Sequence, residues 1–217
     1  MLFRSNTADT WIQMVTIVAV LSALLGNVIA VAQTNLKRML AYSAIGNVGF
    51  ILFGFVAGTE QGYEASLYYT VVYVLMALGA FGAMLLASAR GFEADEIEHY
   101  KGLHARDPFL ALILMALMFS FAGVPPLVGF WAKLQIFQAL WESGHLALVV
   151  FAAAVSVIGL FYYLRIVKTL YFDSPGDLPV PERHGAVRLA LGLNALAVVL
   201  LGLFPQTLIE LCVRALG

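Results

Sequence analysis

Residues 109–140 read FLALILMALMFSFAGVPPLVGFWAKLQIFQAL, and this apolar stretch decides the fold. Lys133 is its single charged residue. A transmembrane helix needs about 20 apolar residues, so the stretch is too long for one straight crossing. Pro125 and Pro126 lie in its middle, where each removes a backbone donor and clashes with the preceding turn. We therefore expect two half-helices that meet near residues 124–127.

The expected break and the lysine together point to the interior of a helix bundle. Non-helical backbone at membrane depth is tolerated only where protein or a water-filled cavity surrounds it. A charged side chain in the membrane costs about 3 kcal/mol or more, so Lys133 is a functional candidate. Burial penalises the charged form of a lysine and favours release of its proton. The stretch therefore predicts a hydrated path on which Lys133 carries protons.

Two simpler interpretations remain open. Pro125 and Pro126 could produce a plain proline kink, although Gly123 and Gly129 beside them favour a full interruption. Lys133 could instead extend its ammonium to the lipid headgroups from a helix end. Seven residues of the stretch still follow it, which at 1.5 Å each places the lysine about 10 Å from that end.

The composition is that of an integral membrane protein. Apolar residues make up 62% of the chain and charged residues 12%, against roughly half and a quarter in soluble domains. The single cysteine, Cys212, excludes a disulfide framework and cysteine-ligated zinc or iron–sulfur sites within this chain. The formal net charge of −1 argues against nucleic-acid binding. The polar N-terminal segment MLFRSNTADT does not resemble a signal peptide.

Six stretches are long and apolar enough to span a membrane. They are residues 11–32, 39–57, 67–89, 109–140, 146–171 and 186–204. Their apolar residues do not alternate with polar ones, so we predict helices and not barrel strands. The sequence thus predicts an all-α, polytopic membrane helix bundle with a broken fourth helix, as a single transmembrane domain over residues 1–217.

The basic residues are unevenly divided between the two sides of this bundle. Successive tails and loops lie on alternate sides of the membrane. On one side there are nine Lys and Arg residues, around Lys37, Lys101 and Arg183. On the other side there are two, Arg4 and Arg214. Short loops rich in Lys and Arg stay cytoplasmic. We therefore predict that both termini lie on the outer side of the membrane.

Uncharged polar side chains recur within the expected spans. They are Asn27, Tyr42, Ser43, Asn47, Tyr69, Thr70, Tyr73, Ser120, Ser156 and Asn194. The candidates for holding waters along a proton path to Lys133 are Ser43, Asn47, Tyr73 and Ser120. The alternative is that these groups join helices by hydrogen bonds worth about 0.6 kcal/mol each. The histidines are interpreted as loop surface residues; they are His99, His104, His145 and His184.

Two segments resemble a known family. Residues Gln33–Phe50 read QTNLKRMLAYSAIGNVGF, and residues Phe121–Phe137 read FAGVPPLVGFWAKLQIF. Both are similar to the antiporter-like membrane subunits of respiratory complex I, the bacterial proton-pumping NADH–quinone oxidoreductase. The resemblance runs along essentially the whole chain. It implies one five-helix repeat of an inverted-repeat fold plus one further helix, with the first half of the family's length absent.

The resemblance also implies a function. Lys133 falls on the family's lysine in a broken helix, which implies a proton-accepting residue of the channel. No cofactor would be bound by this chain, and NAD, FMN, iron–sulfur clusters and quinone would belong to partner subunits. The partners would be other membrane-arm subunits in the bacterial inner membrane, with both termini periplasmic. One departure is Asn47, where family members often carry histidine, because an amide cannot titrate.

Two other functions remain possible from the residues alone. A subunit of a multisubunit cation/proton antiporter would have a similar fold and would need no NADH. A structural membrane scaffold would have no transport role, and Lys133 would then be silent. Neighbouring genes would distinguish the first of these from complex I, and substitution of Lys133 would test the second.

Overall fold

The computed structural model describes residues 2–88, 93–175 and 185–216, with side chains described from Thr10 onward. Every regular element in these ranges is a helix. The long helices are α1 (Leu2–Val31), α2 (Leu36–Ala57), α3 (Glu60–Ala87), α5 (Pro108–Ala122), α6 (Val128–Glu142), α7 (Leu146–Tyr171), α8 (Gly185–Leu203) and α9 (Pro205–Leu216). The 3-10 helix η1 (Ile97–Tyr100) and the short helix α4 (Leu103–Arg106) lie between α3 and α5. The predicted all-α class is confirmed.

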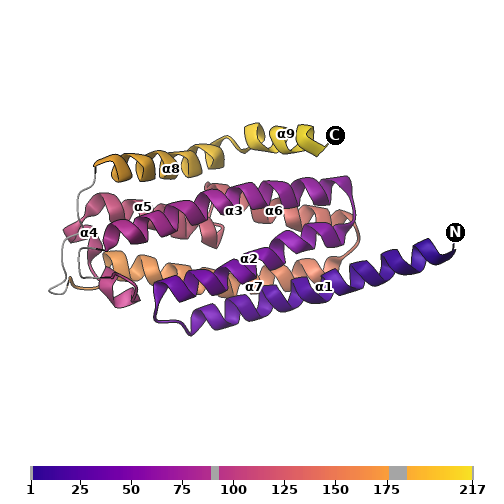
Figure 1. The fold of residues 1–217 in the computed structure, drawn as a ribbon, viewed down its shortest axis with the longest axis horizontal. Helices are drawn as coiled ribbons and strands as arrows, with labels where there is room; N and C mark the ends of the chain where they lie inside the picture. Colours follow the sequence, from indigo (N-terminus) through magenta and orange to yellow (C-terminus); the bar gives the residue numbers. More distant parts are fainter. Residues whose placement is uncertain (1, 89–92, 176–184, 217) are drawn as a thin grey trace.

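The helices run side by side as one elongated bundle (Figure 1). The figure shows α1 along one edge, with its N-terminal end projecting past the other helices, and α8 and α9 along the opposite edge. Glycines bring α1 and α2 into close contact, because a Cβ at Gly26 would meet the backbone of Tyr42 and Gly46. Small residues of this kind drive helix association in membranes, where the hydrophobic effect does not.

The fourth expected span is interrupted, as predicted. Helix α5 ends at Ala122, and Gly123 follows in the left-handed conformation (φ 83°) that glycine adopts without strain. Helix α6 begins at Val128, after the cis peptide bond between Pro125 and Pro126. Five helices of the described residues are long and apolar enough to cross a membrane unbroken, and α5 is a shorter apolar helix.

Several helices begin or end away from the expected bounds. Helix α2 starts at Leu36, after Asn35, whose side chain accepts a hydrogen bond from the backbone of Arg38. Helix α3 starts at Glu60, after the capping residue Thr59. These caps accept hydrogen bonds from backbone N–H groups that have no partner within the first helical turn. The first turns are polar, so a search for apolar stretches does not include them.

The sixth crossing has a second part that the sequence analysis did not include. After α8 ends at Leu203, helix α9 continues the same path along α3 (Figure 1). Four of its twelve residues are polar and exposed, namely Gln206, Thr207, Glu210 and Arg214. This polar stripe lowers the mean hydropathy and hid the segment from a criterion based on apolar length.

Some expectations fall on residues outside the described ranges. They concern the loop position of His184 and the side of the membrane on which Arg183 lies. The other three histidines lie outside the long helices: His99 in η1, His104 in α4, and His145 at the residue before α7.

Candidate functional site

Lys133 lies on the second half-helix of the broken crossing and points into the bundle. Its side chain is buried, with a residue exposure of 8%. The ammonium donates one hydrogen bond of 3.0 Å to the carbonyl of Ala122 and another of 3.0 Å to Ser156 Oγ. It also lies 5.6 Å from the centroid of the Phe50 ring, within the range of a cation–π contact. Among the described residues, no carboxylate forms an ion pair with this ammonium.

The helix break supplies the first of these partners. Ala122 is the last residue of α5, so its carbonyl has no intrahelical donor and is free to accept from Lys133. The C-terminal end of a helix carries partial negative charge, which favours a cation beside it. Gly123 makes room for the lysine stem, since a Cβ there would lie 3.0 Å from Lys133 Cδ. The interruption thus creates the binding environment of the ammonium.

The two half-helices are also joined to each other. Ser120 Oγ accepts a 3.2 Å hydrogen bond from the backbone N–H of Gly129. A Cβ at Gly129 would overlap the carbonyl oxygen of Ser120, so glycine is required for this close approach. The predicted path residue Ser120 is therefore buried at the junction, where its hydroxyl is used to hold the start of α6.

Two other predicted path residues belong to a buried hydrogen-bonded network. Tyr163 donates from its hydroxyl to Ser43 Oγ at 2.8 Å, and Tyr69 donates to Asn47 Oδ1 at 2.7 Å. The Asn47 amide donates to the Ser43 carbonyl at 2.8 Å and lies 3.5 Å from the Tyr163 hydroxyl. The network links α2, α3 and α7 at one depth in the bundle.

Aromatic rings separate this network from Lys133. Phe50, which lies under the ammonium, stacks on Tyr69 with centroids 6.1 Å apart. Phe121 stacks on Tyr163 at 5.4 Å, and the fourth predicted path residue, Tyr73, packs edge-on against Phe121 at 6.0 Å. The structure therefore brings Ser43 and Asn47 together in one network, whereas Ser120 lies at the junction of the two half-helices and Tyr73 packs against Phe121.

Sequence reasoning missed part of this site. Tyr162 and Tyr163 were not considered, and Ser156 was noted only as one polar residue among many. Tyr162 donates a 3.0 Å hydrogen bond to Asn27 Oδ1, across a sequence separation of 135 residues. The available signal was the spacing of Ser156 and Tyr163, which are about two helical turns apart. This spacing places both polar side chains on the same face of α7.

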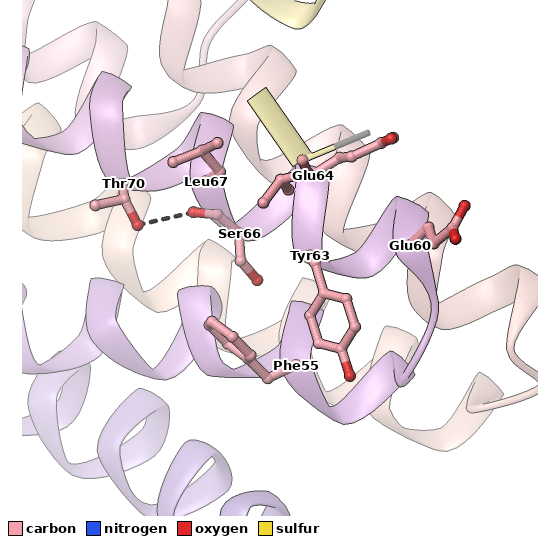
Figure 2. Close-up of a pocket in the computed structure, with 8 residues that line it drawn as sticks. Phe55, Glu60, Tyr63, Glu64, Ser66, Leu67 and Thr70 are labelled. Atoms are coloured by element: carbon pink, nitrogen blue, oxygen red, sulfur yellow. Dashed lines mark hydrogen bonds between the residues drawn. The ribbon is translucent and has the colours of Figure 1, made fainter. Parts of the chain in front are cut away.

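A cavity with acidic residues in its lining lies elsewhere in the bundle. It has a volume of about 440 Å³ and lies beside the turn between α2 and α3, where Leu216 of α9 borders it. Figure 2 shows Phe55 and Tyr63 on one side and the Thr70–Ser66 hydrogen bond on another. Two carboxylates, Glu60 and Glu64, also line it. Lys133 does not border this hollow. The described residues contain no cluster of three or more His, Cys, Asp or Glu that could hold a metal ion.

Comparison with known proteins gives a consistent match. The family model described as NADH:quinone oxidoreductase/Mrp antiporter, transmembrane, matches residues 1–159. The chain is 49% identical over 206 residues to NADH-quinone oxidoreductase subunit N of Nitrosomonas europaea, covering 95% of this chain and 43% of that protein. The same subunit of Thiobacillus denitrificans is 50% identical over 212 residues, covering 98% and 44%. The chain therefore spans less than half the length of these curated relatives.

Solved structures share the fold. Respiratory complex I from Thermus thermophilus with bound aureothin contains a chain with TM-score 0.81 and 29% identity, covering 91% of this chain and 45% of that one. The archaeal membrane-bound sulfane sulfur reductase gives TM-score 0.86 at 29% identity, covering 96% and 42%. The Mrp complex from Dietzia sp. gives TM-score 0.84 at 22% identity over 97% and 48%, which speaks for the fold alone.

Proposed function

The chain belongs to the NADH:quinone oxidoreductase/Mrp antiporter membrane family, and we propose that it is a proton-translocating subunit of a bacterial NADH–quinone oxidoreductase, of the subunit N type. In this proposal it moves protons across the inner membrane while partner subunits transfer electrons from NADH to quinone. The identities near 50% to subunit N favour this function over a cation/proton antiporter, whose likeness here is one of fold.

One observation carries the assignment of Lys133 as proton carrier. Its ammonium is buried and bonded to two neutral acceptors, Ala122 O and Ser156 Oγ. Neutral acceptors can hold the charged form without fixing it permanently, whereas a buried ion pair would resist loss of the charge. Lys133 would thus alternate between ammonium and amine, with the break at Pro125 and Pro126 keeping the α5 carbonyls available. It remains a prediction that the hydrated path includes Ser43, Asn47, Tyr73 and Ser120.

The redox groups would lie outside this chain. NAD, FMN, iron–sulfur clusters and quinone would be bound by partner subunits, and the chain itself would perform no redox chemistry. Its partners would be other membrane-arm subunits within the lipid bilayer. The distribution of basic residues supports a topology in which both termini face the periplasm.

The proposal is tested by comparing Lys133→Met with Lys133→Arg in the fully assembled complex. Met removes the titrating group with similar length, and Arg keeps a charge that is not released below about pH 12. We expect both variants to lower proton pumping and coupled quinone reduction by about tenfold or more, as for loss of a general acid–base group. Pumping is measured in proteoliposomes by quenching of a pH-sensitive dye. Wild-type pumping in an assembled Met variant would exclude Lys133 as an obligatory carrier.

A further inference from the structure

The hydroxyl of Ser156 is used differently from several other hydroxyls on the helices. Thr16, Thr70 and Thr169 each donate a hydrogen bond to the backbone carbonyl four residues earlier, at 2.8–3.0 Å. Serine and threonine side chains on helices often bond their own backbone in this way. In the described part of the chain, Ser156 Oγ instead bonds only the Lys133 nitrogen, from which it accepts at 3.0 Å. The Ser156 proton is therefore not used by a backbone group.

The groups beside the Lys133 nitrogen differ in the hydrogen bonds that they can make. The Ala122 carbonyl lies 3.0 Å from the nitrogen and can only accept. The Phe50 ring, whose centroid is 5.6 Å away, has a negatively polarised face that attracts a cation. A serine hydroxyl can accept through its lone pairs and donate through its proton. Of these three neighbours among the described residues, only Ser156 can donate a hydrogen bond to Lys133.

This difference becomes important when Lys133 loses its proton. An ammonium has three donors and no acceptor, whereas the neutral amine has a lone pair that accepts. The Ser156 hydrogen can rotate about the Cβ–Oγ bond toward that lone pair while its oxygen stays in place. The amine nitrogen is then held where the ammonium was, still donating to Ala122 and now accepting from Ser156. A buried lone pair without such a donor would be left unsatisfied, at a cost in free energy.

We propose that Ser156 is a positioning residue that holds the Lys133 nitrogen in both charge states, as acceptor for the ammonium and as donor for the amine. Ser156 stays neutral and keeps its own proton, so it acts through Lys133 and carries no proton itself. The inference deepens the proposed function of Lys133 and rests on it. Its geometric basis is the 3.0 Å contact together with the uncommitted serine proton.

The test measures proton pumping per assembled complex in proteoliposomes with Ser156→Ala and Ser156→Thr. Alanine removes the hydroxyl, and we expect about tenfold slower pumping, the effect of losing one hydrogen bond to a charged group. Threonine keeps a hydroxyl on the same carbon and should restore most of the rate. Thr169→Val on the same helix is the matched control, because it removes a buried hydroxyl whose partner is the Arg165 carbonyl of α7. This control should pump as wild type does.

A double variant separates the positioning of Lys133 from a general packing role. In the Lys133→Met background, Ser156 has no titrating nitrogen to hold, so Ser156→Ala should cause no further loss of pumping. A packing role predicts that the two losses multiply, because independent effects add in free energy. Multiplied losses, or equal pumping by Ser156→Ala and Ser156→Thr, would overturn the positioning role, while an impaired Lys133→Met leaves the proposed function standing. Wild-type pumping by Lys133→Met would overturn the proposed function itself.

A third substitution tests the donating half of the proposal. Ser156→Asp places a carboxylate beside the ammonium, and a carboxylate accepts hydrogen bonds but cannot donate them. It also forms a buried ion pair, which resists loss of the lysine's charge. We expect Ser156→Asp to pump more slowly than Ser156→Ala in complexes that still assemble. Pumping at or above the Ser156→Ala rate would show that Lys133 needs only an acceptor, and would overturn the change of hydroxyl direction.

Discussion

Asp107 and Arg188 illustrate how single residues fix the loop end of the bundle. Asp107 caps α5, accepting a 3.1 Å hydrogen bond from the backbone of Leu110. The Arg188 guanidinium of α8 donates to both Asp107 oxygens and stacks on the Phe109 ring, 4.6 Å from its centroid. The side chains are 5% and 22% exposed, so water screens this pair only in part. The Asp107 carboxylate thus caps α5 and also binds α8 through Arg188.

Removal of that carboxylate should destabilise the protein. Asp107→Ala removes the cap, worth about 1 kcal/mol, and leaves the Arg188 charge unpaired. Breaking a buried pair typically costs about 3–5 kcal/mol, and we expect the lower end because Arg188 is partly exposed. Thermal unfolding of the assembled complex would measure the loss.

A double variant provides the control for this prediction. Adding Arg188→Met to Asp107→Ala removes the unpaired charge, so part of the stability should return. A double variant less stable than Asp107→Ala would show that the charge left behind was not the cause.

At the scale of elements, the sixth crossing is docked on the break of the fourth. The Trp131 indole donates a 2.8 Å hydrogen bond to the carbonyl of Gly202. A Cβ at Gly202 would collide with the backbone at Pro126, Leu127 and Val128. Helix α8 therefore ends against the irregular segment and shields it from lipid, as non-helical backbone at membrane depth requires.

Gly202→Ala should disturb this docking. The added methyl group meets backbone atoms that cannot rotate away, so we expect a cost of about 1–3 kcal/mol and less assembled complex. Native gel electrophoresis of solubilised membranes would report the amount. Gly192→Ala on the same helix serves as control and should assemble normally. Equal amounts of both variants would contradict the docking role of Gly202.

At the scale of the whole molecule, the bundle has one loop end rich in basic residues and one that is poor in them. The described part of the rich end carries Lys37, Arg38, Lys101 and Arg106, and Lys37 lies 2.6 Å from Asp95. The opposite end holds the turn between α2 and α3 and the residues before α7. The asymmetry predicts which end faces the cytoplasm.

Single cysteines would test this topology. With Cys212 replaced by serine, Glu142→Cys at the poor end should react with an impermeant thiol reagent in spheroplasts. Glu98→Cys at the rich end, where the side chain is 76% exposed, should react in inverted membranes. Labelling after permeabilisation confirms that each thiol is reactive. The opposite pattern would invert the topology.

The sequence by itself determined the membrane class, the helices and the interruption before Lys133. These properties are local, because apolar length decides whether a segment spans, and two prolines end a helix wherever it packs. The criterion of apolar length nevertheless missed the polar first turns of α2 and α3, and it missed α9 because of its polar stripe.

The partners of the buried polar groups were decided only by the tertiary structure. Lys133 meets Ala122 and Ser156, and Tyr162 meets Asn27 across 135 residues of sequence. Such contacts depend on the rotation and relative height of each helix, which are set by glycine contacts such as that of Gly26 with Gly46. A single helix sequence holds no record of what lies opposite it, so Tyr162 and Ser156 gained their importance only when the helices packed.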